Sequence, residues 1–293
     1  MIDRRVKELI RSWSGRIDKA VALGAKNAAA AVASWPDYEW KASLDEFFKL
    51  SEGQDAFYDR PTIGTHYAFW YHTRRVNGLI GEVIKTLERE RQDNPPEIAF
   101  IDLGAGTGAL SWACGLVAMA AKEANQKIPH LRVIEIENSP FMLEAGNTLW
   151  AVFNAEFGVF ESGMSRTSEV ISWTEAEFTE PLPVSVFASY VLDHTDDDAY
   201  RVEELKAALE RVVARCSAQE VVMVTSNSKA AAAIRVLASI GRVDESIPEE
   251  LWVGPMTKTK SARQKVFLSH GLSDQGTPMF SEPWGQRALR VSV

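Results

Sequence analysis

Cysteine is scarce in this sequence, with two residues, Cys114 and Cys216, among 293. Two thiols cannot build a disulfide framework or a cysteine-ligated metal centre, and both stand within helical patterns, so we expect two small buried side chains. Long apolar runs are also missing, since no stretch approaches the roughly 20 residues that cross a bilayer. Residues 1–8 lack the apolar core of a secretory signal. These absences predict a cytoplasmic protein with no metal site and no membrane association.

Positive charge is in the minority. The chain has 32 Lys and Arg residues against 40 Asp and Glu residues, which gives a net charge of −8. This balance argues against a broad nucleic-acid-binding face. One basic run, Lys258, Lys260, Arg263 and Lys265, has two interpretations: it contacts an anionic molecule, or it is a solvated turn.

Hydrophobic residues make up 46% of the chain, enough for a large core. Residues 1–34 and 66–91 have helical patterns, and strands and helices alternate from residue 97 onward. Strands are expected near 98–102, 131–137, 169–174, 184–190 and 220–226, followed by a hairpin near 250–254 and 264–269. We therefore predict an α/β fold with seven mainly parallel strands, one antiparallel strand and helices on both faces. The expected division is an N-terminal helical extension, residues 1–96, and a sheet domain, residues 97–293.

The most informative segment is a buried strand that ends in an acid and continues into a glycine turn. After Asp102, glycines follow at alternate positions, Gly104, Gly106 and Gly108, and helical spacing begins at Ala109. Such a turn presents backbone N–H groups to a nucleoside-like ligand. The glycines also satisfy the dinucleotide pattern G-x-G-x-x-G/A, so alone they do not identify the ligand. Asp102 favours a cationic ligand, because a carboxylate there would repel a pyrophosphate.

This acid-x-Gly-x-Gly-x-Gly segment resembles the first motif of the class I methyltransferases, which use S-adenosylmethionine. The resemblance implies a Rossmann-like fold, S-adenosylmethionine as the methyl donor and S-adenosylhomocysteine as the product. It also implies the first set of cofactor-binding residues: Asp102, Gly104, Ala105, Gly106 and Gly108.

The second expected strand also ends in an acid, Glu137. Asn138 follows, and Ser139 and Pro140 have the pattern of an N-cap and first helical residue. This string resembles the second methyltransferase motif. One ionised carboxylate can accept hydrogen bonds from both ribose hydroxyls, so Glu137 is the expected ribose ligand, with Asn138 beside it and Glu135 as the alternative. Three residues at the end of the third expected strand should lie near the adenine by the same resemblance: Trp173, Thr174 and Glu175.

Polar residues cluster after the fourth expected strand, and this segment resembles the family's fourth-strand motif. The resemblance places Ser189 at the cofactor and the next residues at the methyl-transfer site. His194 is the candidate base, since an unperturbed imidazole titrates near neutrality. Asp193 either orients His194 or takes its role, and Tyr190 shapes the pocket. A purely structural hydrogen bond at the start of the next helix is the alternative role for His194.

The segment ahead of the first strand is rich in aromatic residues, His and Arg. In class I methyltransferases this region often forms one wall of the acceptor pocket. The alternative is that its apolar residues pack a helix onto the sheet while Arg74 and Arg75 are solvated. The candidate substrate-binding residues are Tyr58, His66, Tyr67 and His72.

The predicted function is transfer of a methyl group from S-adenosylmethionine to an O or N nucleophile by in-line displacement. The sequence does not identify the acceptor; a small molecule is favoured over RNA or protein. The chain also bears a fainter likeness to the ribosome-associated methyltransferase-like proteins of the small subunit, but it lacks the cysteine cluster of those proteins. Two alternatives stay open: a non-catalytic scaffold of the same fold and an NAD(P)-dependent oxidoreductase.

Overall fold

The computed structural model describes residues 2–51, 57–90, 95–176, 182–191, 199–216, 218–258, 260–270 and 286–293. Its strands form one seven-stranded sheet of order β3-β2-β1-β4-β5-β7-β6. The strands are β1 (Glu97–Leu103), β2 (His130–Glu137), β3 (Met164–Val170), β4 (Val184–Phe187), β5 (Ala218–Ser226), β6 (Val243–Ser246) and β7 (Gln286–Ser292). β7 runs antiparallel to both of its neighbours, and the other paired strands are parallel. The predicted α/β sheet with one antiparallel strand is confirmed.

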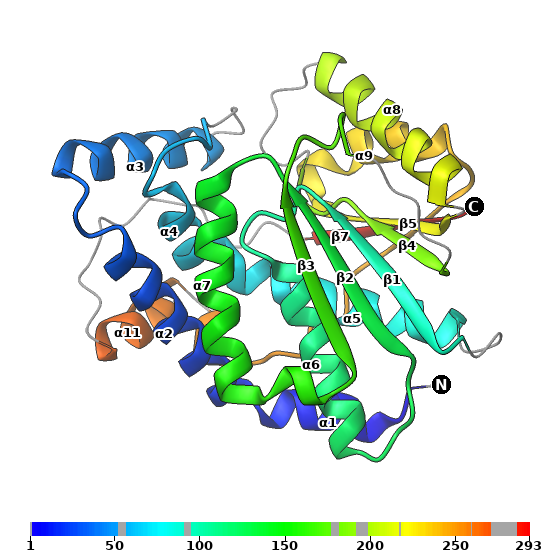
Figure 1. Ribbon diagram of the computed structural model, residues 1–293, viewed down its shortest axis with the longest axis horizontal. Coiled ribbons are helices and arrows are strands. Elements are labelled where there is room, and N and C mark those ends of the chain that lie inside the picture. Colours follow the sequence, from blue (N-terminus) through cyan, green and yellow to red (C-terminus); the bar gives the residue numbers. More distant parts are fainter. Residues whose placement is uncertain are drawn as a thin grey trace.

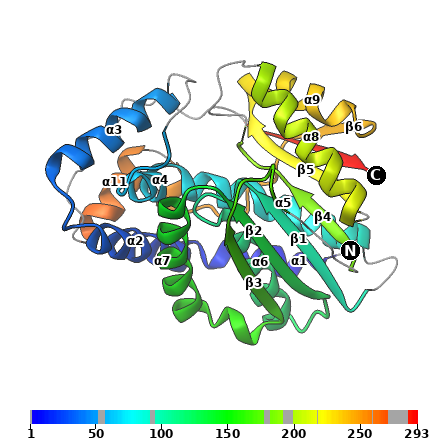
Figure 2. The same cartoon turned by 45° about the horizontal axis from the view of Figure 1, so that its top comes forward.

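Helices cover both faces of this sheet (Figure 1). The helices are α1 (Arg4–Ser12), α2 (Ser14–Ala31), α3 (Asp37–Ser51), α4 (Ile63–Tyr67), the π-helical turn η1 (Ala68–His72), α5 (Thr73–Glu90), α6 (Ala109–Glu123), α7 (Pro140–Phe157), α8 (Ala199–Cys216), α9 (Ala230–Ala238), α10 (Pro255–Lys258) and α11 (Lys260–Ser269). Short 3₁₀ turns lie at Val159–Glu161 and Asn227–Lys229. Figure 2 shows α2, α3, α4 and α11 gathered beside α7, away from α8 and α9.

The central strand β1 divides the hydrophobic core into two layers. Ile98 and Phe100 pack with α1, α5 and α6 on one face. Ala99, Ile101 and Leu103 pack with α8 and α9 on the other. Because neighbouring side chains of a strand point to opposite faces, a continuous apolar run is what a strand covered on both sides requires. The helices α1, α2 and α5 share their core cluster with α6 and β1.

The start of α7 follows the predicted capping pattern. Ser139 is the N-cap, its hydroxyl accepts a hydrogen bond from the Met142 N–H at 3.2 Å, and Pro140 occupies the first helical position. The same hydroxyl donates to the carbonyl of Tyr58 at 2.7 Å. This one side chain therefore both begins α7 and holds the segment before α4 against it.

The predicted strands at 250–254 and 264–269 are wrong. Residues 250–254 have no regular structure, and Trp252 bonds to side chains instead of a neighbouring strand: its backbone N–H donates to Asn77 and its indole N–H to Asp18, both at 2.9 Å. Residues 264–269 lie in α11, where Phe267 packs edge-on to Phe69 with ring centroids 4.6 Å apart. β6 and β7 take the two positions at the sheet edge. The third strand also differs, since β3 spans 164–170 rather than 169–174.

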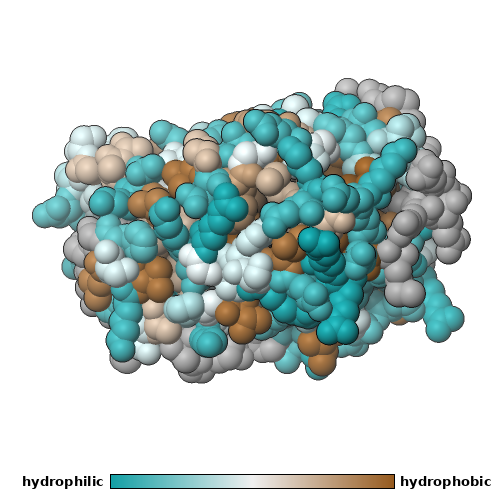
Figure 3. Space-filling view, turned by 90° about the horizontal axis from the view of Figure 1, so that it is seen from below, coloured by the Kyte–Doolittle hydropathy of each residue, from teal (hydrophilic) through white to brown (hydrophobic). Residues whose placement is uncertain are grey.

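No helix in the described part of the chain is long and apolar enough to cross a membrane. On the face shown in Figure 3, apolar residues lie as small separate spots among hydrophilic ones. The apolar side chains of that face are therefore dispersed rather than joined into one patch.

Candidate functional site

Three glycines in left-handed conformation shape the turn between β1 and α6. The angle φ is 72° at Gly104, 57° at Gly106 and 75° at Gly108, a region that residues with a Cβ rarely adopt. The backbone N–H groups of Gly104 and Ala105 donate to the carbonyl of Ile136 at 2.9 and 3.0 Å. The turn is thus tied to the end of the neighbouring strand β2.

Two acids on β2, Glu135 and Glu137, have different surroundings. Glu135 is fully buried and accepts hydrogen bonds from both Nε and Nη2 of Arg166 at 3.0 and 2.6 Å. The hydroxyls of Ser111 and Ser168 also donate to it. Its carboxylate is therefore satisfied by α6 and β3, and it joins those elements beneath the glycine turn.

Glu137 instead lines a cavity. Its two carboxylate oxygens accept hydrogen bonds from the backbone N–H groups of Gly106 at 2.7 Å and Ser139 at 2.9 Å. Burial raises the pKa of Glu137, and the backbone N–H donors and Arg75 only partly offset that rise. A carboxylate offers about four lone-pair directions, more than the backbone donors of Gly106, Asn138 and Ser139 use, so Glu137 can still accept from a ligand.

Asp102 ends β1 and is 4% exposed. Burial raises its pKa well above the usual value, Glu135 and Glu137 raise it further, and Arg75 opposes them. A buried carboxyl group so poorly matched by positive charge gains from a cationic ligand.

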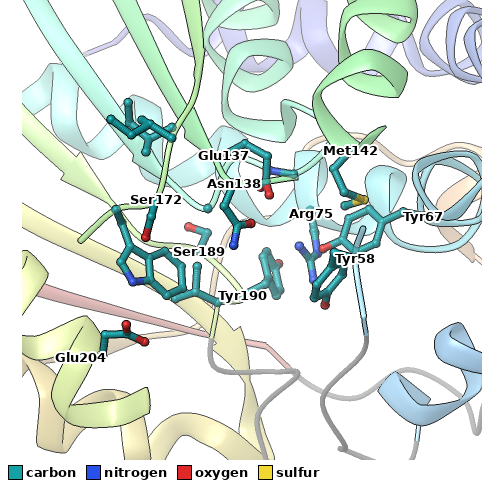
Figure 4. A pocket seen from close by; sticks show the side chains of 16 residues that line it. Tyr58, Tyr67, Arg75, Glu137, Asn138, Met142, Ser172, Ser189, Tyr190 and Glu204 are labelled. Carbon is teal, nitrogen blue, oxygen red and sulfur yellow. The ribbon is translucent and has the colours of Figure 1, made fainter. Parts of the chain in front are cut away.

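The cavity beside the glycine turn has a volume of about 280 Å³. It lies at the carboxyl ends of β1, β2 and β4, where open α/β sheets bind their ligands. Figure 4 shows Glu137 and Asn138 on one side of it and Tyr58, Tyr67 and Arg75 on another. The lining residues are Tyr58, Tyr67, Arg75, Gly104, Gly106, Ile136, Glu137, Asn138, Met142, Ile171, Ser172, Trp173, Ser189, Tyr190, Val191 and Glu204.

Arg75 is the main site residue that sequence reasoning missed. Its solvated interpretation is wrong, because the residue is only 7% exposed. The guanidinium carbon lies 4.4 Å from the ring centroid of Tyr67, 4.6 Å from that of Tyr190 and 5.5 Å from that of Tyr71. Figure 4 shows Arg75 between Tyr190 and the pair Tyr58 and Tyr67. These rings hold the planar cation at the cavity.

Tyr190 presents its ring rather than its hydroxyl to this site. The residue has φ of 63°, unusual for a bulky side chain. Its hydroxyl accepts a hydrogen bond from Gln286 Nε2 at 2.5 Å, and a Cβ on Gly78 would lie 2.6 Å from that oxygen. The hydroxyl is therefore enclosed by α5 and β7, while the ring packs on Arg75.

The structure brings some of the predicted residues together and separates others. The predicted residues that line the cavity are Tyr58, Tyr67, Gly104, Gly106, Glu137, Asn138, Trp173, Ser189 and Tyr190. The described predicted residues that do not line it are His66, His72, Asp102, Ala105, Gly108, Thr174 and Glu175. Asp193 and His194 lie outside the described residues.

The two histidines of the expected acceptor wall are buried behind the cavity. His66 is 1% exposed and packs edge-on to Trp40 with ring centroids 5.6 Å apart. His72 is fully buried, and its Nδ1 lies 3.0 Å from the hydroxyl of Thr107. Burial lowers the pKa of His66 to about 4 and that of His72 to about 3. Both imidazoles are therefore neutral near pH 7.

Several other lining residues carried no distinct sequence signal. Ile171 and Val191 are apolar residues close to the ends of strands, and Glu204 is one of three acids on α8. Nothing in their spacing separates them from ordinary core or surface positions. Among the described residues, no group of three or more His, Cys, Asp and Glu side chains is arranged to hold a metal ion.

Solved structures with similar folds include several methyltransferases. The plantazolicin methyltransferase BpumL in complex with SAH shares 11% identity, the match covers 98% of each chain, and the TM-score is 0.41. Geranyl diphosphate C-methyltransferase from Streptomyces coelicolor A3(2) shares 12% identity over 72% of this chain and 75% of that one, with a TM-score of 0.38. An rRNA methylase from Streptococcus thermophilus shares 7% identity over 72% of this chain and 95% of that one, with a TM-score of 0.38. No protein-family model and no curated protein matches the sequence.

TM-scores at this level do not identify a relative, and the strand order and the turn geometry carry the assignment of the fold. Five parallel strands, a seventh strand inserted antiparallel between the fifth and sixth, and a glycine turn after the central strand occur together here. The chain has a Rossmann-like fold, as the resemblance of its sequence motifs to the class I methyltransferases implies.

Proposed function

We propose that this protein transfers a methyl group from S-adenosylmethionine to an O or N nucleophile by in-line displacement. One observation carries the proposal: Glu137, a buried carboxyl group with a raised pKa, lines one cavity together with the left-handed glycine turn, and Asp102, whose pKa is also raised, ends the neighbouring strand β1. A site of this kind favours a ligand that is positively charged and carries hydroxyl groups. S-adenosylmethionine, when bound, supplies a methyl group already activated by its sulfonium.

The residues present fit this cofactor. Glu137 lines the cavity and keeps acceptor capacity beyond its backbone donors, which suits a ribose hydroxyl. Asp102 lies at the end of β1, where its carboxylate would attract the cationic amino-acid part. Arg75 lowers the pKa of both acids and lines the same cavity, so it would bind the cofactor's own carboxylate.

The other lining residues surround the purine and the acceptor side. We place Trp173, Ile171 and Asn138 at the adenine, since they line the cavity after β3 and β2. Ser189 and the ring of Tyr190 would bound the methyl-transfer side, positioning the acceptor and excluding water. His194, with Asp193, stays our candidate for removing the acceptor's proton. A small molecule is the favoured acceptor, and RNA and protein are alternatives.

The two rival functions receive less support. A pyrophosphate-containing dinucleotide would bring its negative charge close to two acids, Asp102 and Glu137, which would repel it. Arg75 is the nearby cation that lowers the pKa of both acids. A scaffold without a ligand gains nothing from Asp102 and Glu137, whose pKa values burial raises, because burial of charge lowers stability.

A binding experiment tests the cofactor assignment. We expect calorimetry to detect S-adenosylhomocysteine binding, and Glu137→Gln to weaken it at least about 10-fold, because an amide replaces one of the two acceptor oxygens. Glu169→Gln is the matched control: Glu169 lies on the adjacent strand β3, is exposed and does not line the cavity. Its affinity should equal that of the wild type.

Two results would contradict the proposal. Stabilisation by NADH and not by S-adenosylhomocysteine would indicate the oxidoreductase. Binding of S-adenosylhomocysteine with no transfer of labelled methyl groups into any fraction of a cell extract would indicate the scaffold.

A further inference from the structure

Two histidines on consecutive turns of one helical segment are buried without reaching the cavity, and they differ in what they contact. His66 in α4 packs among aromatic rings, with Trp40 and Phe47 as neighbours. His72, the last residue of η1, lies against the glycine turn instead. The difference points to a task for His72 that His66 does not share.

The contact of His72 is with the one residue between two flexible glycines. Its Nδ1 lies 3.0 Å from Thr107 Oγ1, and both residues are at most 1% exposed. Gly106 and Gly108, on either side of Thr107, both have positive φ. Glycine loses more conformational freedom on folding than any other residue, so this turn needs fixed contacts to keep one conformation.

A histidine at this position carries a cost that an apolar residue would avoid. Its Nε2 is buried with no hydrogen-bond partner, and so is the Nε1 of Trp112, whose ring meets the imidazole edge-on with centroids 4.9 Å apart. Phenylalanine would pack against Trp112 without a buried polar nitrogen. The imidazole, unlike a phenyl ring, can form a hydrogen bond with Thr107. Buried polar atoms without a hydrogen-bond partner break a general rule of folding, and such exceptions are concentrated at functional sites.

The backbone around Thr107 is fixed from other directions as well. Glu137 accepts a hydrogen bond from the Gly106 N–H at 2.7 Å. A Cβ on Gly146 of α7 would lie 3.0 Å from the carbonyl carbon of Thr107, so α7 packs directly on the turn. These contacts hold the backbone, and His72 holds the one polar side chain between the two glycines.

We propose that His72 is a positioning residue that acts through Thr107: its hydrogen bond holds residues 106–108 in the conformation that receives the adenosyl cofactor. The inference rests on the proposed function. His72 stays neutral, because burial lowers its pKa. Depending on its tautomer, the Nδ1 of a neutral imidazole either donates a hydrogen bond to the Thr107 hydroxyl or accepts one from it. Its effect is therefore on cofactor affinity, and it does not touch the reacting atoms.

A double-mutant cycle on cofactor affinity tests this role. We expect His72→Phe and Thr107→Val each to weaken S-adenosylhomocysteine binding about 10-fold, the loss typical of one buried hydrogen bond. The double variant should lose no more than either single one, because both remove the same bond. Thr107→Ser keeps the hydroxyl and should bind within about threefold of the wild type.

His66→Phe is the matched control, since it makes the same change at a buried histidine of the same helical segment. It should leave the affinity unchanged. Independent losses that multiply in the double variant would overturn the inference, and so would wild-type affinity in Thr107→Val. If His72→Phe does not fold, Thr107→Val against Thr107→Ser decides the matter. Absence of binding to the wild-type protein would overturn the proposed function, and this inference with it.

Discussion

Buried charge gathers at two places in this sheet, and the two clusters differ in how completely their charges are matched. The edge cluster consists of Glu82, Glu220 and Arg290, where α5 crosses β5 and β7. Arg290 forms ion pairs with both acids, and Arg89 adds a second cation at 2.8 Å from Glu220. The site cluster consists of Asp102, Glu137 and Arg75, where one cation faces two acids.

The pKa values follow this difference. Burial alone would raise the pKa of Glu220, but Arg290, Thr86 and Arg89 together lower it below the usual value. At Asp102 and Glu137 burial raises the pKa, and the opposing interactions do not cancel it. The edge cluster is therefore complete within the protein, whereas the site cluster gains from a positively charged ligand.

Breaking the edge cluster should have the largest effect on stability. Arg290→Met leaves Glu82 and Glu220 buried without their shared cation, and losses of about 3–5 kcal/mol in the free energy of unfolding are typical of such changes. Urea denaturation measures this value. Arg4→Met, in the exposed Arg4–Glu8 pair, is the control and should cost less than about 0.5 kcal/mol. Equal effects of the two variants would mean that the edge cluster is not structural.

Removing a site acid should have the opposite signature. Asp102→Asn should weaken S-adenosylhomocysteine binding about 100-fold, which corresponds to about 2.7 kcal/mol. The reason is that the variant no longer offers a carboxylate to the cationic amino group of the ligand. The free energy of unfolding of the unliganded protein should not fall at pH 7, since a carboxyl group whose pKa is raised by folding is a burden when ionised. Calorimetry and urea denaturation separate the two quantities. Lower stability with unchanged affinity would place Asp102 with the edge cluster.

Asp18 is a third case, a buried carboxyl group away from the cavity. It accepts the indole N–H of Trp252, and burial raises its pKa from 3.8 to about 6, against the opposing effects of that hydrogen bond and Arg263. The folded protein therefore binds more protons than the unfolded chain between these two pH values. Its contribution to stability is complete below pH 3.8 and is lost as the pH rises through about 6.

This predicts the smallest of the three effects. Between pH 5 and pH 7 the wild type should lose about 1 kcal/mol more stability than Asp18→Asn. Urea denaturation of both proteins at the two pH values measures the difference. Other carboxyl groups with raised pKa values are present in both proteins, so their contributions cancel when the two are compared. Parallel pH profiles would show that Asp18 titrates as in the unfolded chain.

The parts of the fold that the sequence predicted are those set by local patterns. β1, β2, β4, β5 and the start of α7 follow from apolar runs, glycine positions and a Ser-Pro cap. β7 was missed because its pattern is not local: the buried Arg290 depends on partners such as Glu82 and Glu220, which lie on α5 and β5. The apolar segment around Trp252 resembled a strand because one large side chain is buried there.

The same limit applies to the site. Glu137 and the glycines were found because each ends or follows a strand, and strand ends converge at one edge of a parallel sheet. The choice of Glu137 over Glu135 as the residue that lines the cavity depends on Arg166 occupying Glu135, a contact between strands. Arg75 was missed because its burial depends on Tyr190, 115 positions away in the chain, whose ring packs over the guanidinium group.

The π-helical turn at residues 68–72 has a consequence for how this chain can vary in length. Tyr67, Tyr71 and Arg75 stack on one side of the segment, while His72 faces the glycine turn on another. Each residue of a helix turns it by about 100°, so loss of one residue here would rotate one set of side chains away from its partners. Substitutions on this segment alter one contact each, whereas an insertion or deletion misaligns two neighbouring sites together.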